Sequence, residues 1–246
     1  MKCKYKFILH TITHSFCTFE ELKEISFYYK ITLSMTTQDH DFITINDTKY
    51  NLKGIESLAW KKLVNGYVKK KNGFRTMCVG TVDDSKAAAM RIVVNRKVDE
   101  VHKTIYFYTD NRSRKYTDLI KDNRISLLFY DVRQRVQIVV KAYATLHTND
   151  AVAKDRWKAT SPQARLGYMT LEPPNTRSDQ PTLGYEERFA ITKPTDDESE
   201  SFEKNFTVVA CEVYELEFLY LDFNGNRKAN FYYENGIATN CFWAVP

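Results

Sequence analysis

The sequence has no long hydrophobic run, and this absence excludes a protein that crosses a membrane with apolar helices. No stretch approaches the roughly 20 apolar residues that such a helix needs, although 43% of the 246 residues are hydrophobic. The first 34 residues begin with lysines and a mildly apolar stretch, but histidine and threonine residues interrupt it. This is a poor signal-peptide core. Internal repeats and low-complexity segments are also lacking, which excludes a repeat architecture. We therefore expect no membrane partner.

Cysteine pairs with redox or metal spacing are absent as well. The five cysteines are widely scattered and never form a C-x-x-C pair, which is typical of a reduced, cytoplasmic protein with free thiols. His10 and His14 are spaced to place two metal ligands on one helical face, but no third ligand is nearby. A closed metal site normally takes about four ligands. We therefore expect no metal.

The sequence lacks a recognisable nucleic-acid-binding motif. Its 36 basic and 31 acidic residues leave a formal charge of +5. This charge is small against the phosphate contacts that nucleic-acid binding uses, so we expect no nucleic-acid partner. The mild positive charge fits a small anionic ligand instead.

What the sequence does contain is a series of short, β-like runs rich in valine, isoleucine, tyrosine and phenylalanine. Turn-forming residues separate several of them, and few helical patterns intervene. Closely spaced strands of this kind favour an antiparallel barrel over alternating strand–helix–strand units. The predicted strands are Phe74–Val82, Ala89–Val94, Thr104–Tyr108, Ile125–Tyr130, Val136–Leu146, Thr207–Leu221, Lys228–Tyr233 and Ile237–Val245.

Two helical regions accompany the strands. Apolar residues at helical spacing predict an amphipathic helix from Ile55 to Tyr67, and a second helical section extends from about Asn149 to Thr170. Within the second section, Pro162 follows Ser161 as expected at a helix start. Short connections indicate one domain over residues 50–246. Residues 1–49 form an N-terminal extension, which is an ordered segment, a tail, or an overhang before a true start at Met35.

Residues 105–119 carry the clearest chemical signal. An alternating strand runs into Thr109, and Ser113, Arg114 and Lys115 follow at the start of a helical pattern. Backbone N–H groups and the helix dipole favour an anion at such a junction, and the two cations add charge-assisted donors. The pattern predicts a phosphate site; the alternative interpretation is an ordinary solvated helix start.

Several separated segments form a pattern together: the helix around Trp60, Met77–Asp83, Met90–Val94, Phe107–Thr109, Ser113–Lys115, and Leu127–Phe129 with Gln137. Their order resembles that of the FMN-binding split-barrel proteins related to pyridoxamine 5'-phosphate oxidase. The similarity extends through most of residues 54–246, and the order and spacing of the motifs are more specific than any one of them. The resemblance implies a mainly β protein with flanking helices, built on a six-stranded antiparallel split β-barrel.

The resemblance also implies an FMN site. Arg91 would reach the phosphate or ribityl chain, Arg114 and Lys115 would bind the phosphate, and Gln137 would hydrogen-bond the isoalloxazine ring. The alternatives are a strand-edge surface residue for Arg91 and a barrel-lining polar group for Gln137. A dinucleotide-binding G-x-G-x-x-G turn is absent, which favours FMN over FAD. The implied cofactor-binding residues are Arg91, Ile92, Val93, Val94, Tyr108, Thr109, Ser113, Arg114, Lys115 and Gln137.

The substrate half departs from the oxidases of that family. Arg96 stands where they have lysine, and the carboxy-terminal Trp…Arg-Leu-His element is missing. We therefore expect an FMN-dependent oxidoreductase acting on an unassigned small substrate, with NAD(P)H as a candidate donor and FMN at the interface of a homodimer. No side chain is clearly a general acid or base. The alternative is a non-catalytic flavin or phosphate-ligand carrier. Residues expected to shape the substrate pocket are Arg96, Trp157, Arg165, Arg227 and Trp243.

Overall fold

The computed structural model describes residues 42–246, in two units that divide after Asn51. The described part of the first unit is a hairpin of β1 (Ile43–Ile45) and β2 (Thr48–Tyr50). Asn46 and Asp47 connect the strands with positive φ angles of 48° and 61°, as a tight primed turn requires. The rest of the predicted extension, including Met35, lies outside the described residues.

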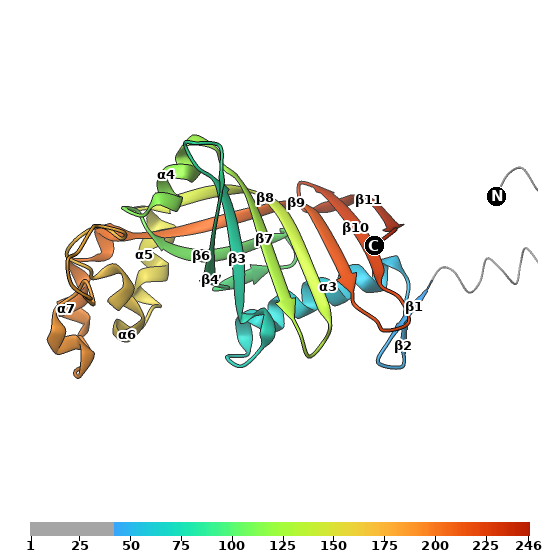
Figure 1. The fold of residues 1–246 in the computed structure, drawn as a ribbon, viewed down its shortest axis with the longest axis horizontal. Helices are drawn as coiled ribbons and strands as arrows, with labels where there is room; N and C mark the ends of the chain where they lie inside the picture. The colour runs from blue at the N-terminus through green and yellow to red at the C-terminus, as the bar shows by residue number, and fades with distance from the viewer. Residues whose placement is uncertain (1–41) are drawn as a thin grey trace, which may run out of the picture. The chain divides into compact units, whose positions relative to one another are not determined.

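The second unit is built on one large antiparallel sheet (Figure 1). Its strands follow the predicted runs closely, and the sequence analysis missed only the short β5. The sheet order is β11-β10-β9-β8-β7-β3-β4, with β6 paired to both β9 and β5. The strands are β3 (Thr76–Val82), β4 (Ala88–Val94), β5 (Lys97–Asp99), β6 (Thr104–Asp110), β7 (Arg124–Asp131), β8 (Val136–Thr148), β9 (Phe206–Tyr220), β10 (Arg227–Glu234) and β11 (Ile237–Ala244).

The sheet closes into a six-stranded barrel because the chain bends between β4 and β5. The backbone N–H of Arg96, at this bend, donates to the carbonyl of Tyr106 on β6 at 2.9 Å, and β5 then pairs with the same strand. The N-terminal part of β9 pairs with β6, whereas its C-terminal part pairs with β10. The ring therefore runs β4/β5, β3, β7, β8, β9, β6, and β10 and β11 extend the sheet beyond it. The predicted antiparallel split barrel is confirmed.

Alternating side chains fill the barrel, as the period of a strand requires. On β7, for example, Ile125, Leu127 and Phe129 are buried while the intervening side chains are not. Helix α3 (Leu52–Val68) packs against the sheet through Trp60, whose indole Nε1–H donates to the Tyr233 hydroxyl at 3.0 Å. In the described part of the chain, no helix is long and apolar enough to span a membrane.

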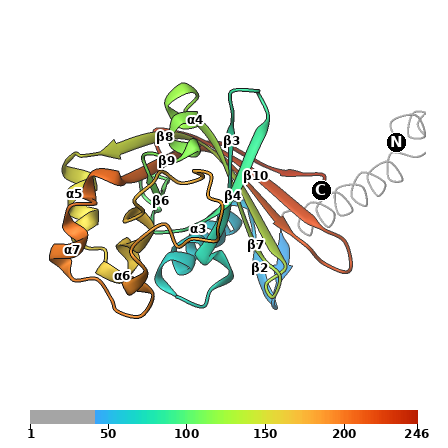
Figure 2. The same cartoon turned by 60° about the vertical axis from the view of Figure 1, so that its left-hand side comes forward.

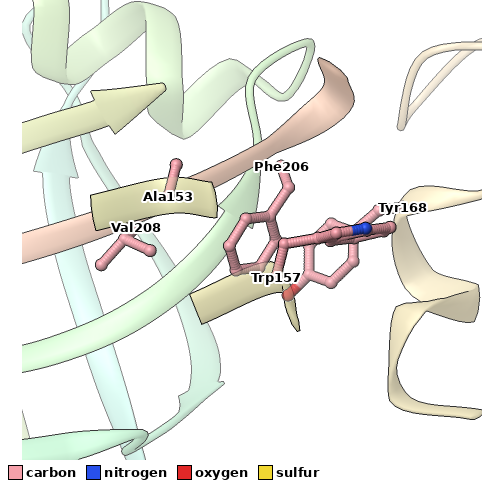
Figure 3. Packing of buried hydrophobic residues seen from close by; sticks show 5 residues of the cluster. All are labelled: Ala153, Trp157, Tyr168, Phe206 and Val208. Carbon is pink, nitrogen blue, oxygen red and sulfur yellow. The ribbon is translucent and has the colours of Figure 1, made fainter. Parts of the chain in front are cut away.

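A helical segment between β8 and β9 gathers at one end of the sheet (Figures 1 and 2). The sequence predicted one helical section over 149–170, but the structure breaks it into α5 (Ala151–Lys158), α6 (Pro162–Arg165) and a 3-10 turn (Leu166–Tyr168). Ser161 precedes Pro162 at the start of α6, as predicted. Trp157 packs on Phe206 and Tyr168 in a buried aromatic cluster (Figure 3). This cluster fixes α5 to β9. The remaining helix, α7 (Asp196–Glu200), lies in the same segment.

Candidate functional site

The site lies at the junction between the end of β6 and the start of helix α4 (Arg114–Lys121). Ser113 is the N-cap residue of α4, but its side chain makes no capping hydrogen bond. Its hydroxyl donates instead to the carbonyl of Asp110 at 2.7 Å and lies 3.1 Å from the Thr109 hydroxyl. The first turn of α4 therefore keeps the uncapped N–H groups that favour an anion.

Lys115 points into this junction and not into solvent. Its ammonium donates to the hydroxyls of Thr109 at 3.0 Å and Ser113 at 3.3 Å. Burial, and the nearby positive charge of Arg91, hold the pKa of Lys115 below its ordinary value, whereas Asp110 and Asp118 oppose that shift. Within residues 42–246, Lys115 forms no ion pair. It is a half-buried cation whose hydrogen-bond partners are neutral hydroxyls.

Both nearby carboxylates are already occupied by other groups. Asp110 accepts from the guanidinium of Arg112 at 2.7 and 3.0 Å. Asp118, on α4, accepts from the Thr81 hydroxyl at 2.7 Å and lies 3.7 Å from the guanidinium of Arg91. Neither carboxylate therefore neutralises Lys115 directly.

Arg91 supplies the second cation from β4. Its guanidinium donates to the Thr81 hydroxyl at 2.6 Å and to the carbonyl of Ala89 at 2.8 Å. Burial lowers the pKa of Arg91, and Asp118 counteracts that effect. We call the group formed by Arg91, Thr109, Ser113 and Lys115 the cation cradle.

Arg114 lies apart from its neighbour Lys115. Its side chain is 61% exposed and pairs with Asp83, in the turn between β3 and β4, at 2.9 Å. Asp83 also accepts from the backbone and hydroxyl of Ser85. Of the two predicted phosphate-binding cations, Lys115 faces the cradle and Arg114 is at its outer edge.

The other implied cofactor residues divide between two faces of the sheet. Ile92 is exposed on β4, so its neighbours Arg91 and Val93 lie on the opposite face, and Val94 ends the strand. Gln137 is on β8 beside Tyr130 and Leu219. Two strands, β7 and β3, lie between β8 and the strand that carries Arg91, and within this chain the structure does not bring Gln137 to the cradle.

The residues expected to shape the substrate pocket also fall into two groups. Arg96 stacks over the Tyr108 ring at 5.3 Å, and Arg165 stacks over Trp157 at 4.7 Å. Arg165 is buried and donates to Ser199, Asp196 and the Trp157 carbonyl, so it fastens the helical segment together.

Arg227 and Trp243 lie on β10 and β11, at the other end of the sheet order. The Arg227 guanidinium donates to the carbonyls of Gly225 and Asn226 in the turn that precedes β10. One chain therefore does not gather the five residues into a single pocket.

Sequence reasoning missed Thr81 and Asp118, which orient Arg91. Thr81 lies within the matching segment Met77–Asp83, which assigned it no role, and Asp118 lies outside the matching segments. The only available signal was the position of Asp118, three residues after Lys115 and thus near it on the helix surface. The structure also shows no group of three or more His, Cys, Asp or Glu side chains arranged for a metal ion among residues 42–246.

The family model for pyridoxamine 5'-phosphate oxidase matches residues 67–184, which contain the whole cradle. This part of the chain belongs to the pyridoxamine 5'-phosphate oxidase-related split-barrel family. Two curated family members, each named pyridoxine/pyridoxamine 5'-phosphate oxidase, are similar in sequence. The protein from Proteus mirabilis is 41% identical over 68 residues, which are 27% of this chain and 30% of that protein. The protein from Burkholderia lata is 30% identical over 114 residues, 46% of this chain and 51% of that protein.

The matches thus span about half or less of these curated relatives. Among solved structures, a pyridoxamine 5'-phosphate oxidase-related, FMN-binding protein from Nostoc punctiforme aligns with a TM-score of 0.61 at 18% identity. The alignment covers 77% of this chain and 96% of that one. PhzG from Burkholderia lata aligns with a TM-score of 0.59 at 14% identity, covering 77% and 91%. These structural likenesses establish that the family's fold is present.

Proposed function

We propose that this protein binds FMN and is an FMN-dependent oxidoreductase acting on a small substrate. The observation that carries the proposal is the cation cradle, in which Lys115 donates to two hydroxyls and is repelled by the nearby positive charge of Arg91. A phosphate dianion there would accept charge-assisted hydrogen bonds and relieve that repulsion. The donor set fits a terminal phosphate of this kind. The family membership, and the description of the Nostoc relative as FMN-binding, support FMN as its source.

When bound, FMN would supply the redox chemistry, taking up or giving a hydride. The chain's own residues would bind and orient it. Lys115 and Arg91 would hold the phosphate, Thr109 and Ser113 would accept or donate hydrogen bonds beside it, and Asp118 would keep Arg91 aimed at the site through its contact with Thr81. Arg114 would add positive charge at the edge.

We further propose a homodimer with flavin at the interface, because the outer face of the sheet carries a row of apolar side chains and Gln137 lies on that face, away from the cradle. Ile92, Cys78, Leu128 and Val139 are direct cross-strand neighbours on β4, β3, β7 and β8. Direct neighbours share one face of a sheet. Ile92 is 67% exposed and Met90, two residues away on the same edge strand, is 65% exposed. A second copy covering this face could bring its Gln137 toward the flavin of the first.

The test uses purified protein incubated with FMN and freed of excess flavin. Reduced nicotinamide nucleotides or small amines are added without oxygen while the flavin absorbance is followed, and air is then admitted. Bleaching by a donor followed by recovery in air is the result expected of an oxidoreductase. Retained flavin that no donor reduces would contradict the catalytic part and leave a flavin carrier. Failure to retain flavin would contradict the whole proposal.

A further inference from the structure

A second site lies on the opposite face of β6 from the cation cradle. A cavity of about 370 Å³ opens between β6 and α5, lined by the rings of Tyr106 and Tyr108, the aliphatic Val152, and the charged Lys97, Asp155 and Arg156. Ligand pockets commonly begin at about 300 Å³, so its size suits a small organic molecule.

This cavity is separate from the cradle because of strand geometry. Successive side chains of a strand point to opposite faces. Thr109 contributes its hydroxyl to the cradle, so the ring of the preceding Tyr108 leaves β6 on the other side. Tyr106, two residues earlier, shares that side and lines the same cavity. The backbone of β6 thus lies between the two sites.

The charges lining the cavity leave one positive charge unbalanced. Arg156 pairs with Asp155 at 2.6 Å. The Lys97 ammonium lies 5.1 Å from the centre of the Tyr106 ring and has no ion-pair partner within the described chain. The negative charge of Asp99 helps to raise the pKa of Tyr106. However, the Asp99 carboxylate is already paired with Nδ1 of His102 at 3.0 Å. One cation therefore remains available in a cavity with aromatic and aliphatic walls.

We propose that this cavity binds a planar organic anion bearing a single carboxylate. Lys97 would form the charge-assisted hydrogen bond with the carboxylate. Arg156 would donate a second hydrogen bond while it remains paired with Asp155. The tyrosine rings and Val152 would enclose the planar part of the ligand. A phosphate monoester carries about two negative charges near neutral pH, more than the single positive charge left in the lining. The proposal rests on the cavity and does not depend on flavin binding.

The experiment titrates the full-length protein, with and without FMN, with 2-naphthoate as the probe and follows binding by calorimetry. Neutral 2-naphthalenemethanol tests the need for the charge, and inorganic phosphate tests a site for any anion. Lys97→Met removes the ammonium while keeping an aliphatic stem. Lys154→Met makes the same change on an exposed residue of α5 outside the cavity. Val152→Phe fills the cavity from a partly exposed position, which guards against a variant that simply misfolds.

We expect saturable binding of 2-naphthoate, weakened about ten- to hundred-fold by Lys97→Met and equally weakened by loss of the probe's charge. Val152→Phe should abolish binding and Lys154→Met should leave it unchanged. FMN binding should survive both Lys97→Met and Val152→Phe, so that failure of this site and failure of the flavin site are distinguishable. The proposal is overturned if 2-naphthoate does not saturate, if phosphate competes with it at equal concentration, or if the Lys97 and Lys154 variants behave alike.

Discussion

The Lys115 ammonium lies 3.0 Å from the Thr109 hydroxyl, and this contact joins the first turn of α4 to the end of β6. It holds a cation inward at a site where Arg91 supplies a second one. Two neighbouring positive charges in a partly buried site are unfavourable when no anion is bound there. The contact therefore ties the local fold of the strand–helix junction to the proposed binding of a phosphate.

Replacing Lys115 with alanine should weaken FMN binding by about ten- to hundred-fold, since a charge-assisted hydrogen bond contributes about 1.5–3 kcal/mol. Arg114→Ala should weaken it less, because Arg114 is exposed and already pairs with Asp83. Lys121→Ala is the matched control, at the exposed end of the same helix. Flavin fluorescence titration gives the dissociation constants. Equal losses in the Lys115 and Lys121 variants would place the phosphate elsewhere.

FMN affinity should fall as pH rises, beginning below pH 10.5. In the protein without FMN, burial and the positive charge of Arg91 lower the pKa of Lys115 from its ordinary value of 10.5. A bound phosphate would raise this pKa again. Loss of the proton therefore opposes binding once the pH passes the lowered pKa. Lys115→Arg keeps its charge over that range and should show a flatter profile. Titrations across alkaline pH test this, and identical slopes in both proteins would contradict it.

Asp118→Ala should destabilise the fold by about 1–3 kcal/mol, because it leaves the buried Thr81 hydroxyl without its acceptor and Arg91 without its carboxylate. Denaturant unfolding measures the difference in the free energy of unfolding. Asp84→Ala, which removes an exposed carboxylate paired with Lys121, is the control and should change stability by less than about 1 kcal/mol. A near-neutral Asp118 variant would show that this network is not structural.

Ile92→Glu should dissociate the proposed dimer, because it places a charge in the apolar outer face of β4. Val101→Glu is the control, since Val101 is 74% exposed in the turn between β5 and β6. Light scattering coupled to size-exclusion chromatography reports the mass of each variant. A wild-type monomer, or a dimer that tolerates Ile92→Glu, would contradict the assigned interface.

Much of the fold was predictable because strand alternation is local. The β-like runs Ile125–Tyr130 and Val136–Leu146 can each be recognised from their own residues. The structure extends each run by only one or two residues at an end. The bend at Arg96 that closes the barrel was not predictable, since it depends on a hydrogen bond to Tyr106 from another strand.

The candidate site, like the fold, was predictable from the sequence only in part. Its residue types were visible in sequence, but which neighbour points inward was not. Arg114 and Lys115 are about 100° apart around the helix, and only packing of α4 against β3 and β8 turns Lys115 toward Thr109. The separation of Gln137 from Arg91 likewise follows from sheet order, which strand patterns alone do not specify.

The most direct test of the proposed function is the identity of the flavin that the native protein retains. The protein is incubated with equal amounts of FMN and FAD, freed of unbound flavin, and examined by native mass spectrometry with release of the ligand. Selective retention of FMN by the wild-type protein, reduced in Lys115→Ala but not in Lys121→Ala, is the predicted result. Retention of FAD, or of no flavin, would contradict the assignment of the cation cradle as an FMN phosphate site.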